Sequence, residues 1–177
     1  SAGTPDLNMA VLANETSSIL LDKDGEQFFD LGMYTETGAM YQDVEYIEMS
    51  QNLIDAFVSI EDSRFFKHQG FDVPRFTKAL IENVQAGRFA QGGSTITMQL
   101  IKTSHLTSAK QLTRKAQEIN LALDLENTIS KEQIFEYYVN KINYGAGNSR
   151  GVEGASQYYF NKTASELSIS ESALLAG

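Results

Sequence analysis

The spacing of apolar residues from Ser50 onward constrains the fold most strongly, because it follows the period of an α-helix. Leu53, Ile54, Phe57 and Val58 fall on one helical face. No internal repeat or low-complexity tract interrupts the pattern that follows. The pattern therefore predicts a mainly helical structure from Ser50 to the end of the chain.

Capping residues divide this region into helices. Asp72 with Pro74 predicts a helix start, and Gly87 predicts its end. Further helices are expected over residues 95–106 and 110–127. Four apolar residues of the second are expected to face inward, namely Leu112, Ala116, Ile119 and Leu123. Capping boxes at Ser130/Gln133, Thr163/Glu166 and Ser168/Glu171 mark later starts, the first of a helix ending near 143–145.

The region before Ser50 has a different character. Residues 18–31 (SILLDKDGEQFFDL) carry apolar residues on both sides of Asp24-Gly25, which predicts a β-hairpin with a tight turn. Residues 1–17 show no period and are expected to form a leader or linker. The predicted fold is mainly α, with one domain over 18–177 and a small N-terminal β-hairpin. The last helical pattern is incomplete at Gly177, so we expect a C-terminal part of the domain to be missing from this sequence.

Composition excludes several classes of protein. The chain has 23 acidic and 14 basic residues and a formal net charge of −9, which argues against a nucleic-acid partner. It has no cysteine, so disulfides and thiolate chemistry are excluded. No stretch approaches the 18 apolar residues that would span a membrane. What remains is an acidic domain able to bury a sizeable core.

The charge is unevenly distributed along the chain. Residues 83–117 contain no acid and five bases, whereas the segments on both sides are acidic. Such a window is typical of a site for an anion such as a phosphate, although a solvated basic face would have the same composition.

Three clusters carry residues suited to chemistry. Glu61 and Asp62 end an apolar helix, where reduced hydration makes a carboxylate a better base; both could equally be surface charges. Gly92 to Gln99 (GGSTITMQ) offers backbone N–H groups to an anion, or is an ordinary capped loop that lacks the ending of a nucleotide P-loop. Arg114, Lys115 and Glu118 share one helical surface, as catalytic groups or as a simple salt bridge.

Taken in order, these clusters resemble glycosyltransferase family 51, the peptidoglycan glycosyltransferase domains of class A penicillin-binding proteins and the monofunctional transglycosylases. The matching motifs are E-D-x-x-F-x-x-H-x-G-x-D at 61–72, G-G-S-T-I-T-x-Q at 92–99, R-K-x-x-E at 114–118 and K-x-x-I-x-E-x-Y-x-N at 131–140. A fifth stretch, from Gly151 to Gly177, is similar to the closing motif of the family. The resemblance covers about residues 41–177.

The resemblance implies a lysozyme-like helical fold and the polymerisation of lipid II. The acceptor 4-hydroxyl attacks the anomeric carbon of the donor with inversion, and undecaprenyl diphosphate leaves. By position, Glu61 is the expected general base and Glu118 the second catalytic glutamate. Substrate- and diphosphate-binding roles fall on Asp62, Ser94, Gln99, Lys102, Lys110, Arg114 and Lys115. His68, Gly70, Tyr138 and Asn140 are interpreted as structural.

The resemblance also implies the partners and the location. Expected partners are lipid II, the growing glycan strand, the bacterial membrane and moenomycin-type inhibitors, with no nucleic acid. The expected location is the extracytoplasmic face of the bacterial plasma membrane, with the anchor and any transpeptidase domain outside this sequence. No cofactor is expected to be required, and no metal-ligand spacing is visible. Mg or Mn would at most assist at the diphosphate, beside Glu118.

Two other functions are open to a chain of this kind. A lysozyme-type glycoside hydrolase also uses carboxylates in a helical domain, but its neutral product gives no reason for the acid-free basic window. A non-catalytic module that binds lipid-linked saccharide would not need the candidate catalytic groups, all of which are present. A glycosyltransferase accounts for both observations.

Overall fold

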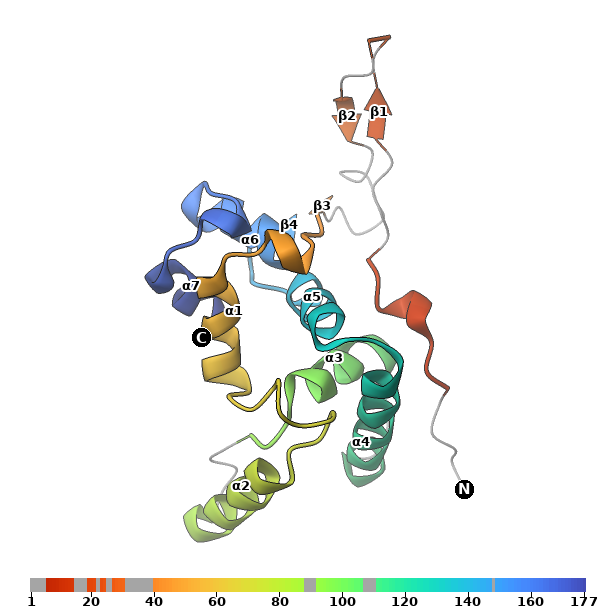
Figure 1. The fold of residues 1–177 in the computed structure, drawn as a ribbon, viewed down its shortest axis with the longest axis vertical. Helices are drawn as coiled ribbons and strands as arrows, with labels where there is room; N and C mark the ends of the chain where they lie inside the picture. Colours follow the sequence, from red (N-terminus) through yellow and green to blue (C-terminus); the bar gives the residue numbers. More distant parts are fainter. Residues whose placement is uncertain are drawn as a thin grey trace. The chain divides into compact units, whose positions relative to one another are not determined.

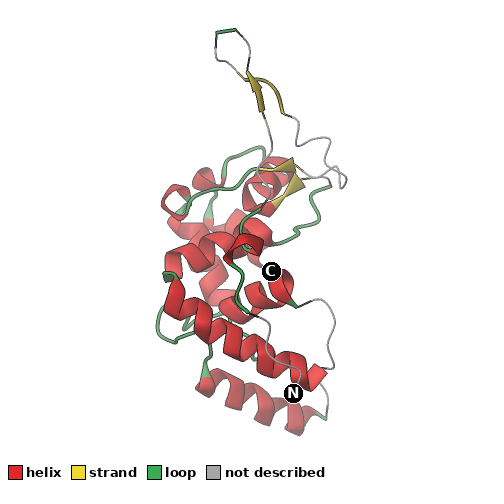
Figure 2. Ribbon diagram, turned by 90° about the vertical axis from the view of Figure 1, so that its right-hand side faces the viewer, coloured by secondary structure: helices red, strands yellow, loops and turns green. Residues whose placement is uncertain are grey.

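The computed structural model describes residues 6–14, 19–21, 23–24, 27–30, 40–87, 92–106, 111–147 and 149–177. Helices dominate the described residues, and the strands are short (Figure 2). The chain forms two compact units. The first comprises Ser1–Leu12 and Val58–Tyr138, and the second comprises Ala13–Phe57 and Val139–Gly177. The boundaries fall inside two helices, α1 (Gln51–Glu61) and α5 (Lys131–Lys141).

The first unit is helical and holds α2 (Val73–Ala86), α3 (Ile96–His105) and α4 (Gln111–Thr128), labelled in Figure 1. It also includes a short 3-10 helix, η1 (Met9–Val11), the end of α1 and most of α5. The side chain of Asp72 accepts a hydrogen bond from Arg75 N at the start of α2, and Gly87 ends this helix with a φ of 61°. Both predicted caps of α2 are therefore confirmed.

Helix α3 is the central element of the first unit and packs against α4. Ile96, Met98, Leu100 and Ile101 are fully buried, whereas Lys102 is exposed. Burial of each large apolar side chain contributes roughly 1.5–3 kcal/mol. Thr95 caps the helix by accepting a hydrogen bond from Met98 N. The buried residues thus fix α3, while one edge stays accessible to a ligand.

The second unit combines the first turns of α1 with α6 (Gly151–Phe160) and α7 (Ile169–Ala176). Its short elements are η3 (Tyr46–Glu48), η4 (Ala164–Glu166) and two strand pairs. Strands β1 (Ile19–Leu21) and β2 (Gln27–Asp30) pair antiparallel, and β3 (Met40–Tyr41) pairs in parallel with β4 (Ser149–Arg150). Gly25 of the predicted hairpin turn lies outside the described residues, so that turn stays a prediction.

Asn140 has a structural position in the second unit. Its amide accepts a hydrogen bond from Val44 N at 3.2 Å and donates one to Val44 O at 2.9 Å. Gly151, with a φ of 72°, lies so close that an added Cβ would be 2.7 Å from Asn140 O. The structural interpretation of Asn140 is confirmed.

Two of the helix predictions need correction. Helix α4 buries Glu118, Leu121, Ala122 and Leu125, while Ala116 is exposed and Leu123 is 38% exposed. The predicted inward positions of Ala116 and Leu123 are wrong, because α4 has a second apolar stripe (Leu121, Ala122 and Leu125), and that stripe is the one buried. Ile119 is half-buried, and the side chain of Leu112 lies outside the described residues. Helix α5 ends at Lys141, before the expected 143–145.

Candidate active site

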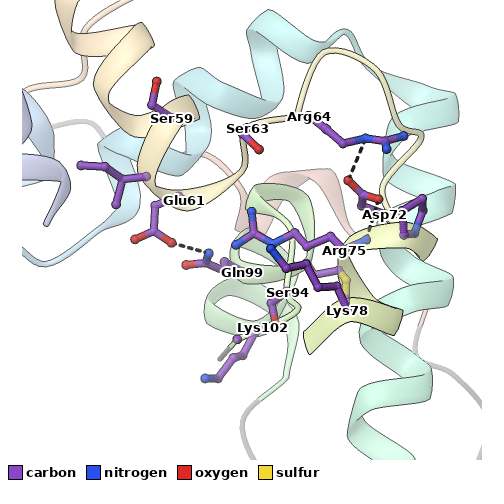
Figure 3. Close-up of a pocket in the computed structure, with 14 residues that line it drawn as sticks. Ser59, Glu61, Ser63, Arg64, Asp72, Arg75, Lys78, Ser94, Gln99 and Lys102 are labelled. Carbon is purple, nitrogen blue, oxygen red and sulfur yellow. Dashed lines mark hydrogen bonds and ion pairs between the residues drawn. The ribbon is translucent and has the colours of Figure 1, made fainter. Parts of the chain in front are cut away.

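A cleft of about 760 Å³ opens in the first unit (Figure 3). The end of α1, the loop after it, the start of α2, residues 92–94 and one edge of α3 form its walls. Its charged lining residues are Glu61, Arg64, Asp72, Arg75, Lys78 and Lys102. The cleft therefore holds more positive than negative charge, although the whole chain is acidic.

Glu61 lies at the last position of α1 and is half-buried. Its Oε2 accepts a hydrogen bond of 2.8 Å from Gln99 Nε2, which Figure 3 shows as a dashed line. Gln99 Oε1 in turn accepts a hydrogen bond of 3.2 Å from the Tyr138 hydroxyl. Burial, and then the charges of Glu61 and Asp62, raise the pKa of Tyr138 well above its ordinary value. Among the described residues, the carboxylate is thus held by an amide and forms no ion pair with a basic side chain.

Asp62 has no exposed surface and does not line the cleft. Its Oδ2 accepts hydrogen bonds from Ile96 N at 3.0 Å and, at 2.8 Å, from His68 Nε2. Arg75 Nη1 lies 3.9 Å from its other carboxylate oxygen. The structure therefore places Asp62 as an anchor for the first residue of α3, and not at a surface where the predicted substrate contact would occur.

A second buried carboxylate lies on the far side of His68. Glu126 Oε1 is 4.0 Å from His68 Nδ1 and accepts hydrogen bonds from Thr97 at 2.6 Å and Lys131 at 2.7 Å. Lys131 also lies over the Phe65 ring, 4.4 Å from its centroid. Burial lowers the pKa of Lys131, against the opposing effect of Glu126. His68 is therefore enclosed by a buried polar network and does not line the cleft.

The third cluster assembles around Glu118. Its side chain is 4% exposed, and its carboxylate lies 2.8 Å from Lys115 Nζ and 3.6 Å from Arg114 Nε. Lys115 Nζ also donates a hydrogen bond of 2.7 Å to the Ser94 hydroxyl. Ser94 lines the cleft, so this hydroxyl connects the cluster to it. The acid-free window therefore supplies two cations that compensate a buried glutamate.

The predicted site residues did not include three cations of the cleft, namely Arg64, Arg75 and Lys78. Arg75 and Lys78 extend from α2 into it (Figure 3) and are three positions apart on the helix. They escaped notice because they belong to the acidic segment 1–82. The net charge of a segment includes carboxylates that lie far from the cleft, so it hides a local group of cations. The helical spacing after the Asp72 cap would have placed Arg75 and Lys78 on one face of the helix.

The predicted site residues thus separate into groups. Glu61, Ser94, Gln99 and Lys102 line the cleft. Arg114, Lys115 and Glu118 form the ion cluster behind Ser94. Asp62 is buried, and Lys110 lies outside the described residues.

The residues near Glu118 do not fit a dedicated metal site. Both of its carboxylate oxygens face cations, Arg114 and Lys115. In the described ranges, no three acidic or histidine side chains group closely enough to hold a metal ion. A divalent cation at Glu118 would have to displace a basic residue. The statement that no cofactor is required stays a prediction.

This arrangement suits acid–base chemistry beside an anion. A carboxylate with one engaged oxygen can accept a proton from a hydroxyl group, and cations on two walls stabilise negative charge that develops nearby. The described fold is mainly helical, and its cleft combines a carboxylate with basic side chains on two walls.

Comparisons with known proteins identify the family. Residues 31–177 match the family described as Transglycosylase. Penicillin-binding protein 1A of Clostridium botulinum is 44% identical over 178 residues, covering 98% of this chain and 21% of that protein. Penicillin-binding protein 1A of Haemophilus influenzae is 47% identical over 134 residues, covering 76% and 16%. Penicillin-binding protein 1F of Bacillus subtilis is 38% identical over 160 residues, covering 90% and 22%.

The chain belongs to the transglycosylase family, which confirms the resemblance seen in its motifs. It is a peptidoglycan glycosyltransferase domain. It spans about a fifth of the length of the Clostridium botulinum protein. In the part of the chain that the structure describes, no helix has the length and hydropathy needed to cross a bilayer.

Proposed function

We propose that this domain polymerises lipid II into glycan strands with Glu61 as the general base. The acceptor 4-hydroxyl gives its proton to the Glu61 carboxylate as its oxygen bonds to the anomeric carbon of the donor. The donor's bond to undecaprenyl diphosphate breaks on the opposite side, and the electron pair leaves with the diphosphate. The configuration of the anomeric carbon is therefore inverted.

The observation that supports this proposal is the position of Glu61 in a cleft where basic lining residues outnumber acidic ones. Arg75, Lys78 and Lys102 line the same cleft, and Glu61 is held by an amide and not by one of these cations. A base paired with a cation would accept a proton less readily, whereas cations set apart from it remain available to the diphosphate.

In this proposal Glu118 does not contact the substrate and acts through the basic residues beside it. Its carboxylate holds Lys115, which donates to Ser94 in the cleft wall, and Arg114 lies beside it. We assign Arg114 and Lys115 to the leaving diphosphate, with Glu118 orienting them. Lys110 is assigned to the same group through its family position alone.

The partners and location follow from the family. We propose that the domain works at the extracytoplasmic face of the bacterial plasma membrane on lipid II and the growing strand. Moenomycin-type inhibitors are expected to occupy the same cleft. We further propose the lysozyme-like arrangement of helices, with residues 18–177 as the catalytic domain. No step requires a metal ion.

The test compares wild-type protein with Glu61→Gln on purified lipid II. The amide keeps the size of the side chain but cannot take a proton from the hydroxyl, so we expect turnover to fall at least 1000-fold, about 4 kcal/mol in the barrier. Gel separation of the polymeric glycan measures the product.

Two controls make the result decisive. Circular dichroism must give equal helix content for both proteins, and Glu132→Gln, an exposed residue of α5, must retain full activity. Equal polymer from wild type and Glu61→Gln would refute the role of Glu61. Release of short reducing sugars in place of polymer would favour the glycoside hydrolase.

A further inference from the structure

A chain of two hydrogen bonds connects Tyr138 to the proposed base. Tyr138, on α5, donates to Gln99 Oε1 at 3.2 Å, and Gln99 Nε2 donates to Glu61 Oε2 at 2.8 Å. Tyr138 is 5% exposed, and it does not line the cleft. Its hydroxyl is thus linked to the Glu61 carboxylate through the Gln99 amide.

The direction of this chain is fixed by chemistry. An ionised carboxylate only accepts hydrogen bonds, so the Gln99 atom that faces Glu61 must be the amide nitrogen. The amide oxygen then faces Tyr138, which must donate. Burial raises the pKa of Tyr138, so its hydroxyl keeps its proton at neutral pH and remains a donor. The opposite amide orientation would set two acceptors against each other at Glu61.

The same contacts distinguish the two oxygens of Glu61. Oε2 accepts the Gln99 hydrogen bond, whereas Oε1 has no hydrogen-bond partner among the described residues. A general base needs an oxygen within hydrogen-bond reach of the incoming hydroxyl, and the Gln99 contact leaves Oε1 for that role. The orientation of the Gln99 amide thus also determines which oxygen of Glu61 is available to the acceptor hydroxyl.

We propose that Tyr138 is a positioning residue for the catalytic base, which it orients through Gln99 so that Oε1 of Glu61 takes the proton of the acceptor. This inference rests on the proposed function of Glu61. It replaces the purely structural interpretation of Tyr138. In the transfer, the proton moves from the acceptor hydroxyl to Oε1, the new C–O bond forms, and the electron pair of the old bond departs with the diphosphate.

The first experiment is steady-state kinetics of Tyr138→Phe on lipid II. The change removes one oxygen and keeps the ring, so substrate binding should be preserved. We expect kcat to fall about tenfold and KM to stay within twofold, because the lost interaction orients the base and does not touch the substrate. Tyr137→Phe, the neighbouring half-buried tyrosine of α5, is the matched control and should change neither constant.

A double-mutant cycle separates positioning from general packing. If Tyr138 acts through Gln99, then Tyr138→Phe should change kcat less than twofold in a Gln99→Ala background. A further tenfold loss in that background would overturn the proposal, as would a rise in KM with unchanged kcat.

A measurement without turnover keeps the inference separate from the proposed function. The side-chain amide of Gln99, observed by NMR with ¹⁵N labelling and assigned by its loss in Gln99→Ala, should exchange its protons with water at least fivefold faster in Tyr138→Phe. Tyr137→Phe should leave the exchange rate unchanged. Wild-type protein that makes no polymer would refute the proposed function, whereas an unchanged amide signal in Tyr138→Phe would refute the positioning role.

Discussion

Gly70 offers the sharpest test of how the loop after α1 holds the site. Its φ is 82°, and a Cβ added there would lie 2.6 Å from Ala122 O and 2.7 Å from the carbonyl carbon of the same residue. Its own carbonyl accepts a hydrogen bond of 2.6 Å from the Thr95 hydroxyl, which caps α3. Gly70 therefore lies between the backbone of α4 and the start of the helix that carries Gln99.

The expected cost of Gly70→Ala has two parts. A left-handed backbone costs a residue with a Cβ about 1–2 kcal/mol, and forcing an atom into a filled space adds about 1–3 kcal/mol. We expect the free energy of unfolding to fall by about 3–4 kcal/mol. For a chain of this size, this corresponds to a decrease in Tm of about 10 °C.

Gly87→Ala is the matched control, because Gly87 has a φ of 61° but no atom within 4 Å of an added Cβ. Only the backbone term applies, so its Tm should fall by about 3 °C. Thermal unfolding followed by circular dichroism at 222 nm measures both variants. If Gly70→Ala melts within 2 °C of Gly87→Ala, the close approach of Gly70 to α4 is refuted.

Two further perturbations test the buried and the capping charges. Lys131→Met should lower the free energy of unfolding by about 3 kcal/mol, because it leaves the buried Glu126 carboxylate without its cation. Adding Glu126→Gln should recover at least half of this loss in urea unfolding, and a single variant as stable as wild type would contradict the reasoning. Glu171 has a pKa of about 2, lowered by hydrogen bonds from Lys162 and then Ser168, against an ordinary 4.5. Its contribution to stability is complete above about pH 4.5 and is lost as the pH falls towards 2. Wild type should therefore lose more stability than Glu171→Gln over that interval, and parallel urea midpoints would count against this role of Glu171.

The sequence predicted the parts of the fold that depend on local chemistry. Asp72 and Gly87 bound α2, and Ser130 with Gln133 opens α5 through hydrogen bonds of 3.2 Å in each direction. These signals are reliable because a cap acts within a single turn. Helix α6 went unpredicted, because Arg150 precedes it without a side-chain cap.

The parts that escaped prediction depend on contacts distant in sequence. Asp62 and Glu61 are consecutive and look equivalent in the sequence, yet one is buried and the other lines the cleft. Only the positions of Ile96 and His68 separate them. Likewise, α4 has two apolar stripes, and its own sequence does not show which is buried. The buried one holds Leu121 and Leu125 beside Glu118, whose charge two cations compensate. The order of the motifs therefore predicted which residues belong to the site. Which of them line the cleft and which are buried behind it became clear only from the structure.

The two consecutive carboxylates at the end of α1 bind α3 one turn apart, Asp62 at Ile96 N and Glu61 at the Gln99 side chain. Glu61 and Asp62 are consequently both attached to α3. A small displacement of α3 should therefore move the two carboxylates together and keep their relative orientation. A change that shortens or lengthens the 92–95 loop would shift α3 along its axis and break both contacts. Engineering of the cleft should therefore keep that loop at its length and vary the α2 wall at Lys78, which lies 3.7 Å from Glu82. Arg75 should be kept, because it lies 3.9 Å from the Asp62 carboxylate.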